Sequence, residues 1–484
     1  MIVMRMSQKA PSVPAMKRSL VATTVVLAGI LPVVAATPAF AAPAYAPGST
    51  PGGDPYFPAS GNGGYDVQNY RLNLAYDPPT GRLDGTAALV LQATADLSSL
   101  SLDLRGLTVS KVVVDGRSVP FSQEPGVDGR GGELVVPVKA IRYTTHQVAV
   151  TYGGVPGRST DVSGELYGWV STPDGALVAN EPEGAATWFP VNDVPSDKAT
   201  YDFVITVPAG KTAVANGDPV GKPTTANGKT SWRWHSREPM ASYLATASIG
   251  DYELTTQLGV HGQPIYDFVD RDITGRDRTT TLAALAKEPA MIAFLETVYG
   301  PYPFTSAGSI VDDDSVGYAL ETQTKPVYSR RASEGTVLHE LAHQWVGNSV
   351  TPEQWRDIWL NEGFAVYSEW LWNEHNGRAT LQQQFDDVMA IPADDEFWTV
   401  LPGDPGAVDL FAGATYDRGA ATLFALRTEI GEKAFATLLR RWATEHRFGT
   451  VTTADLIALA EQVGGKQLDA FFDTWLYTPA KPAV

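Results

Sequence analysis

The chain has 484 residues, of which 44% are hydrophobic and 19% are charged, a balance typical of folded globular proteins. It contains no cysteine, which excludes disulfides, thiolate metal ligands and thiol catalysis. Its net charge of −18 argues against general binding to nucleic acid or anionic membranes, because no basic excess is available to neutralise phosphates.

Residues 1–41 have the features of an export signal. Lys17 and Arg18 precede an apolar run from Leu20 to Ala36, and Ala39-Phe40-Ala41 matches an Ala-x-Ala cleavage site. A transmembrane anchor is the alternative, but the run is short for a span and is interrupted. We therefore expect cleavage near Ala41 and a secreted protein without a stable membrane span.

The next two parts of the chain differ in composition and pattern. Residues 42–64 are rich in proline, glycine and serine, which predicts a flexible leader. Residues 65–258 show strand patterns instead. Apolar and polar residues alternate as in a half-buried strand, and the apolar positions are Tyr70, Leu72, Leu74 and Tyr76.

Two dipeptides in this second part are hairpin turn signals. They are Asp115-Gly116, which follows three valines, and Asn227-Gly228, which lies between two threonine-rich stretches. Long helical patterns are absent from residues 65–258. This part is therefore expected to form an antiparallel β-sandwich domain.

Helical spacing prevails in residues 259–484, which are expected to form a mostly α domain. A helix is predicted over 281–299, interrupted or kinked at Pro289. Further helices are predicted at Ser333–Val346, Asn361–Glu374, Ala420–Ile430, Glu432–Glu445 and Thr453–Val463. The fold class is thus α+β, with a β domain followed by a helical domain.

The pattern that carries most chemical information is His339-Glu340-Leu341-Ala342-His343. Residues four apart share one face of a helix, so both imidazoles can reach one ion with Glu340 beside them. Neutral imidazoles suit Zn²⁺, and a hydrolytic zinc site has three protein ligands and one open position. A helix with two surface histidines is the plainer alternative.

Glu362 is the candidate third ligand. It follows His343 by nineteen residues and opens the next predicted helix, within Trp-Leu-Asn-Glu-Gly-Phe-Ala. Gly347, Asn348 and Pro352 supply a helix stop and a turn, so the second helix can return beside the first. His339, His343 and Glu362 would form a His₂Glu site for one zinc ion.

These motifs together resemble the aminopeptidase N family of zinc metallopeptidases, which also includes leukotriene hydrolase. Three further stretches are similar to family motifs. Residues 181–201 look like its β-domain segment, Tyr318-Ala319-Leu320-Glu321-Thr322 looks like its Gly-Ala-Met-Glu-Asn motif, and Tyr416-Asp417-Arg418-Gly419 looks like its Tyr-x-Lys-Gly motif. The chain ends near the usual end of the family's catalytic domain, so a short form without the C-terminal helical domain is expected.

The resemblance implies a saddle-like β domain, a thermolysin-like catalytic domain and zinc-dependent removal of N-terminal residues from peptides. Glu340 would be the general base, and Tyr416 would donate to the oxyanion. Glu321 would bind the substrate's free α-ammonium, with a second contact from Glu181. Peptides with a free N-terminus would be the substrates, and a monomer is expected.

Glu369 lies seven residues after Glu362 and on the same helical face, where it could accept a ring N–H from a ligating histidine. A solvated acid on the helix surface is the alternative reading.

Two other functions remain open. The exopeptidase motif is altered at three positions, which leaves a zinc endopeptidase with a more open cleft as one rival. A non-catalytic zinc-binding module is the other, although binding alone would need neither Glu340 nor Tyr416.

Overall fold

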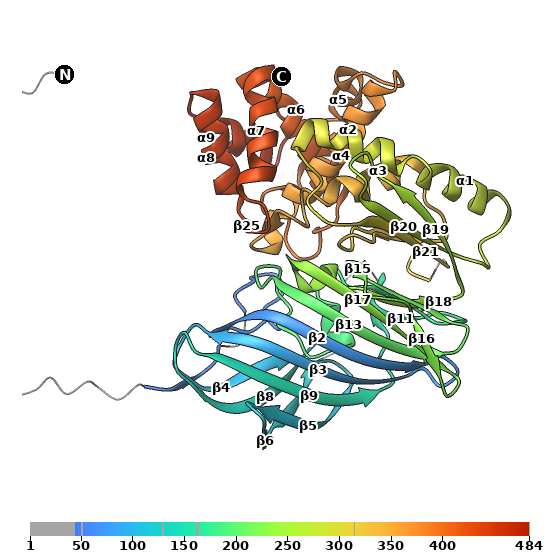
Figure 1. Ribbon diagram of the computed structural model, residues 1–484. Helices are drawn as coiled ribbons and strands as arrows, with labels where there is room; N and C mark the ends of the chain where they lie inside the picture. Colours follow the sequence, from blue (N-terminus) through green and yellow to red (C-terminus); the bar gives the residue numbers. More distant parts are fainter. Residues whose placement is uncertain (1–43, 50–51, 128–129, 161–163, 314, 484) are drawn as a thin grey trace, which may run out of the picture. The chain divides into compact units, whose positions relative to one another are not determined.

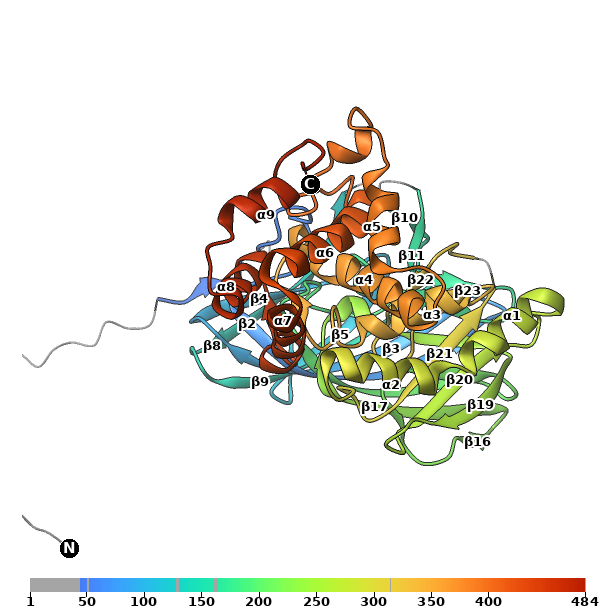
Figure 2. The same ribbon diagram turned by 90° about the horizontal axis from the view of Figure 1, so that it is seen from above.

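The computed structural model describes residues 44–49, 52–127, 130–160, 164–313 and 315–483. The predicted export signal, 1–41, lies outside these residues. In Figure 1 the blue-to-green strands lie below the yellow-to-red helices, and Figure 2 shows the helices in front of the strands. Within the described residues, no helix combines the length and the apolar character needed to cross a membrane.

Strands from three sheets make up the first half of the chain. The largest has nine strands, in the order β15-β17-β13-β2-β3-β9-β5-β6 with β16 paired to β17. Its members are β2 (Tyr65–Asp77), β3 (Arg82–Ala93), β5 (Thr108–Val114), β6 (Arg117–Val119), β9 (Thr145–Gly154), β13 (Ala199–Pro208), β15 (Asp218–Pro219), β16 (Thr224–Ala226) and β17 (Lys229–Met240).

Two smaller sheets complete this half. One has the order β1-β4-β8-β7, formed by β1 (Ala46–Pro47), β4 (Leu97–Asp103), β7 (Ser122–Val127) and β8 (Arg130–Ala140). The other has the order β10-β11-β12-β18-β14, formed by β10 (Ser159–Thr160), β11 (Leu166–Ser171), β12 (Ala176–Ala179), β14 (Thr212–Ala215) and β18 (Ala247–Gly250).

Local sequence explains much of this β domain. The alternating residues of β2 are buried as predicted, with Tyr70, Leu72, Leu74 and Tyr76 at most 3% exposed. Asp115 and Gly116 both have positive φ, and so do Asn227 and Gly228, which confirms the two predicted hairpins. The large sheet is antiparallel except for β2 and β13, which pair in parallel.

The segment before β2 is held by hydrogen bonds, although its composition predicts a flexible leader. The Asp54 carboxylate accepts from the Trp355 N–H at 2.7 Å, and the Asn62 N–H donates to the Asn192 side chain at 2.6 Å. Buried polar partners in both halves of the chain therefore hold residues 52–64, which lack an apolar pattern.

A further five-stranded sheet belongs to the second half of the chain, in the order β19-β20-β21-β23-β22. Its strands are β19 (Tyr252–Leu258), β20 (Pro264–Asp270), β21 (Ala307–Asp312), β22 (Ala319–Leu320) and β23 (Val327–Ser329). The predicted boundary between residues 258 and 259 falls inside the hairpin that opens this sheet. Strands β24 (Thr351–Pro352) and β25 (Thr450–Val451) form a separate parallel pair.

The predicted helices are present. The segment 281–299 is divided into α1 (Gly275–Leu285) and α2 (Glu288–Tyr299), with Pro289 in the first turn of α2. The others are α3 (Glu334–His343), α4 (Trp359–His375), α6 (Gly419–Ile430), α7 (Glu432–Glu445) and α8 (Thr453–Gly464). Two short helices were not predicted, α5 (Leu381–Met389) and α9 (Asp469–Leu476).

Candidate metal centre and active site

Helix α3 presents His339 and His343 on one face. Its N-cap is Ser333, whose side chain accepts from the Thr336 N–H, and it ends at His343, four residues before Gly347, whose φ is 117°. The two imidazole rings lie one turn apart, with ring centres separated by 4.7 Å. The spacing predicted from the sequence is therefore realised in the fold.

Helix α4 packs beside α3 and carries Glu362 in its first turn. The Glu362 Oε2 atom lies 3.2 Å from His339 Nε2 and 3.4 Å from His343 Nε2. All three residues therefore direct one ligand atom to a common point.

The outer nitrogens of both imidazoles have partners of their own. His343 Nδ1 faces the Val346 carbonyl oxygen at 3.1 Å, and His339 Nδ1 lies 2.8 Å from Glu369 Oε1. When these Nδ1 atoms carry the protons of neutral imidazoles, both Nε2 lone pairs point at the Glu362 carboxylate. Three acceptors that converge in this way fit a cation, and two imidazoles with one carboxylate suit Zn²⁺.

Buried carboxylates surround this point. Glu340 is 5% exposed and Glu321 is 2% exposed. Burial raises the pKa of Glu340 to about 8, and burial likewise raises the pKa values of Glu321 and Glu181. Carboxylates of Glu181, Glu321 and Glu362 lie within 4.8 Å of one another, and a cationic partner would relieve the repulsion between their charged forms.

Glu321 and Glu181 each have a buried carboxylate oxygen without a hydrogen-bond partner among the described residues. Glu321 follows edge strand β22, and its own carbonyl accepts from Asn348 Nδ2 at 2.6 Å and from Gln344 Nε2 at 3.3 Å. Glu181 precedes Pro182 in a cis peptide bond. Backbone contacts hold Glu321 while its carboxylate stays available for a ligand.

Tyr416 reaches the same site from a third direction. It lies in a π-helical turn, Ala414–Arg418, and its ring centre is 6.2 Å from that of His339. Burial and then the neighbouring carboxylates raise the pKa of Tyr416 well above its ordinary value, so the phenol stays neutral and able to donate.

Arg418 anchors the turn that carries Tyr416. Its side chain is fully buried and donates to five backbone carbonyls. They belong to Trp398, Val400, Thr474, Trp475 and Thr478, at distances of 2.7 to 3.4 Å. The guanidinium therefore connects the active-site turn to the C-terminal end of α9.

All eight residues predicted for the site line one pocket of about 240 Å³, together with Ala319 and Thr336. Sequence reasoning missed the residues that hold this pocket together. Gln344 and Asn348 support Glu321, and Nζ of the half-buried Lys198 donates to the Asn348 and Ser349 carbonyls at 2.9 and 3.0 Å. For Gln344 and Asn348, the only signal in the sequence was their closeness to the His-Glu-x-x-His motif.

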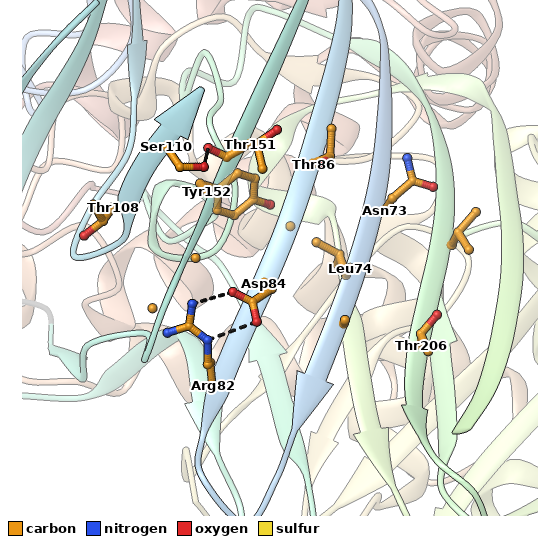
Figure 3. Close-up of a pocket in the computed structure, with 15 residues that line it drawn as sticks. Asn73, Leu74, Arg82, Asp84, Thr86, Thr108, Ser110, Thr151, Tyr152 and Thr206 are labelled. Carbon is orange, nitrogen blue, oxygen red and sulfur yellow. Dashed lines mark hydrogen bonds and ion pairs between the residues drawn. The ribbon is translucent and has the colours of Figure 1, made fainter. Parts of the chain in front are cut away.

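A larger hollow of about 650 Å³ lies on the face of the nine-stranded sheet and contains none of these residues (Figure 3). Its charged side chains, Arg82 and Asp84, pair with each other through two hydrogen bonds of 2.6 and 3.0 Å. The Ser110 hydroxyl donates to the Thr151 carbonyl. These internal partnerships give the hollow no evident chemistry.

Comparisons with known proteins agree with the geometry. Residues 66–244 match the peptidase M1 N-terminal domain, and residues 315–475 match the peptidase family M1 domain. Aminopeptidase A of Gloydius brevicauda is 25% identical over 460 residues, which are 86% of this chain and 48% of that protein. Aminopeptidase N of Lactobacillus delbrueckii subsp. lactis is 28% identical, over 87% of this chain and 52% of that protein.

The chain thus spans about half the length of these curated relatives. A solved M1 zinc metallopeptidase mutant from Deinococcus radiodurans, bound to a Tyr-Ser-Ala substrate, is matched over 98% of its length and 89% of this chain. The TM-score is 0.81 at 28% sequence identity. Both domains of the family are present, and the chain therefore belongs to peptidase family M1.

Proposed function

We propose that the protein is a zinc-dependent aminopeptidase that removes single residues from the free N-terminus of peptides. One observation carries the proposal. Two carboxylates that each have a buried, unpartnered oxygen, Glu181 and Glu321, share a pocket with the converging His339, His343 and Glu362. This pairs a site for an α-ammonium with a site for a hydrolytic metal.

His339, His343 and Glu362 would hold the zinc ion, because their lone pairs converge and the outer ring nitrogens already have partners. Bound zinc supplies a Lewis acid that polarises a carbonyl and lowers the pKa of water. Glu369 and the Val346 carbonyl would fix the two ring orientations, since each lies at an Nδ1 atom.

Glu340 is the general base of this proposal. Its carboxylate is buried beside His343 and has no role in the three-residue ligand set. It would accept a proton from the attacking water molecule and pass it to the leaving amine. Tyr416 would donate its phenolic proton in a hydrogen bond to the oxyanion that forms on the scissile carbonyl.

Glu321 and Glu181 would determine where the peptide is cut. An α-ammonium between the two carboxylates gains charge-assisted hydrogen bonds in a buried setting. The scissile carbonyl then lies one residue away, which limits removal to a single N-terminal residue. The relatives named aminopeptidase and the Deinococcus structure with its Tyr-Ser-Ala substrate support this assignment.

We also propose export, on the basis of the basic, apolar and Ala-x-Ala segments within residues 1–41. N-terminal sequencing of the protein from culture medium tests this. A first residue at position 42 is expected, and a retained segment 1–41 would contradict export by this signal.

Paired peptides test the enzymatic proposal. Each peptide is offered with a free and with an acetylated N-terminus, with and without a chelator, and products are followed by mass spectrometry. Stepwise loss of single residues from the free peptides alone, stopped by the chelator and restored by Zn²⁺, is expected. Internal cleavage of both forms would indicate an endopeptidase, and no cleavage of either form would favour a binding module.

A further inference from the structure

A second pocket adjoins the metal pocket. It has a volume of about 280 Å³ and shares three lining residues with the metal pocket, Glu181, Ala319 and Tyr416. In the proposed function, Glu181 binds the substrate ammonium and Tyr416 faces the scissile carbonyl. In that arrangement the Cα of the first residue would lie between these two groups, and its side chain would leave the metal pocket through the shared boundary.

The walls of this second pocket are mainly aromatic. Four aromatic rings line it, those of Tyr167, Tyr318, Phe411 and Tyr416. Phe411 and Tyr318 both pack against the core of the β domain, which restricts their movement. Aromatic rings in a pocket wall favour stacked or edge-to-face contacts with an aromatic ligand.

The charge of the pocket has one sign. Its lining includes two carboxylates, Glu165 and Glu181, and among the described residues that line it there is no Lys, Arg or His. A negatively charged side chain would enter against like charge, whereas a guanidinium would meet negative charge and aromatic rings.

Tyr318 gives the pocket its shape. Its hydroxyl donates to the Leu166 carbonyl at 2.7 Å, so the side chain reaches from the residue before edge strand β22 to strand β11 of the β domain. Replacement of Tyr318 by glycine would remove this aromatic wall of the pocket.

We propose that this pocket receives the side chain of the substrate's first residue, that it selects aromatic and basic side chains and excludes acidic ones, and that Tyr318 is the residue that determines this selection. The proposal rests on the aminopeptidase function proposed above. It also separates the protein from its relatives named glutamyl aminopeptidase, because the lining offers no cation to an acidic side chain.

The first test compares aminoacyl 4-nitroanilides of Phe, Arg, Ala and Glu on the full chain with zinc. The Phe and Arg substrates should have the highest kcat/KM, and the Glu substrate should fall at least about 100-fold below Phe. A Glu substrate within about tenfold of Phe would overturn the pocket assignment while leaving the aminopeptidase function intact. Failure on every free-amine substrate would instead remove the proposed function.

Two substitutions at Tyr318 test the wall. Tyr318→Gly should lower the ratio of kcat/KM for Phe over Ala by about tenfold, because one stacking face is lost. Tyr318→Phe keeps the ring and should keep most of that ratio. An unchanged ratio in Tyr318→Gly, with normal zinc content and thermal unfolding, would overturn the role of Tyr318.

The charge of the pocket is tested at Glu165, which is exposed and therefore tolerant of substitution. Glu165→Gln should lower the ratio of Arg over Phe by about threefold, the modest effect of an exposed ion pair. Glu165→Lys should also raise kcat/KM for the Glu substrate. If neither variant changes these ratios, the charge selection is wrong.

Discussion

Gly363 of α4 and Gly419 of α6 meet backbone to backbone, so that a Cβ on either residue would lie 2.9 Å from the Cα of the other. Gly363 follows the proposed ligand Glu362, and Gly419 ends the turn that carries Tyr416. The close approach of the two helices therefore determines how far the proposed metal ligand lies from the proposed oxyanion donor.

Gly363→Ala should separate the two helices. A methyl group at 2.9 Å from backbone forces a shift, and overpacking of this kind costs about 1–3 kcal/mol of the free energy of unfolding. We expect a lower kcat as well, because Tyr416 moves relative to Glu362. Gly413→Ala is the matched control, since a Cβ there meets nothing within 4 Å and its φ is an ordinary −51°. Equal behaviour of the two variants in unfolding and turnover would contradict the argument.

Glu340→Gln should keep the metal and lose turnover. The amide preserves the size of the side chain but cannot accept the proton, and loss of a general base costs about 10²–10⁴-fold in kcat. Zinc content by mass spectrometry should stay at one ion per chain. Glu432→Gln, at a side chain that is 73% exposed, controls for loss of a carboxylate elsewhere. Wild-type kcat in Glu340→Gln would rule out the assigned base.

Glu321→Gln should weaken recognition of the free N-terminus. The backbone contacts to Asn348 and Gln344 remain, but the buried carboxylate that faces the ammonium is lost. Removal of one partner from such a pair lowers kcat/KM by about 100-fold for free peptides. N-acetylated peptides have no ammonium, so any residual cleavage of them should be unaffected. Equal losses on both forms would show that Glu321 has another role.

Arg418→Lys retains the positive charge but should displace Tyr416, because Arg418 anchors the turn that carries it. Lysine has three donors on a flexible stem and cannot satisfy the five buried carbonyls that the planar guanidinium holds. We expect a lower kcat with little change in KM or zinc content. Tyr416→Phe should change kcat in the same direction, with a loss of about 10²–10³-fold. Arg427→Lys on α6, which bonds to the exposed Glu432, should be close to wild type.

Asp197 makes stability depend on pH. It is 8% exposed, and burial raises its pKa from 3.8 to about 7. Because the folded state binds this proton more tightly than the unfolded state, the free energy of unfolding should fall as pH rises from about 4 to about 7. Each group of this kind contributes at most about 1.4 kcal/mol per pH unit.

Asp197→Asn should reduce that slope, measured by urea unfolding between pH 4 and pH 8. Part of the slope should remain, because burial also raises the pKa of Asp193 to about 6 and that of Asp312 to about 7. Asp386→Asn on the exposed side of α5 is the control. A slope identical to that of the wild type would show that Asp197 is ionised in the folded state.

Local patterns predicted the elements and part of the site. The four-residue spacing of His339 and His343 forces them onto one helix face, and the connection that follows the helix end at His343 lets Glu362 return beside them. Helix and hairpin positions followed from periodicity and turn residues for the same reason, since these signals act within a few residues. The short helices α5 and α9 were missed because their length offers little periodicity to detect.

What the sequence determined by itself was the identity of the candidate metal ligands, the general base beside them and the order of a β domain before a helical one. Only the tertiary structure decided how Glu181, Glu321 and Tyr416 meet the metal ligands, and that Arg418 and Lys198 hold backbone carbonyls. It also decided the aromatic pocket, in which the Tyr318 hydroxyl donates to the carbonyl of Leu166, 152 residues earlier in the chain. Contacts of that kind depend on packing between distant segments, which no local pattern encodes.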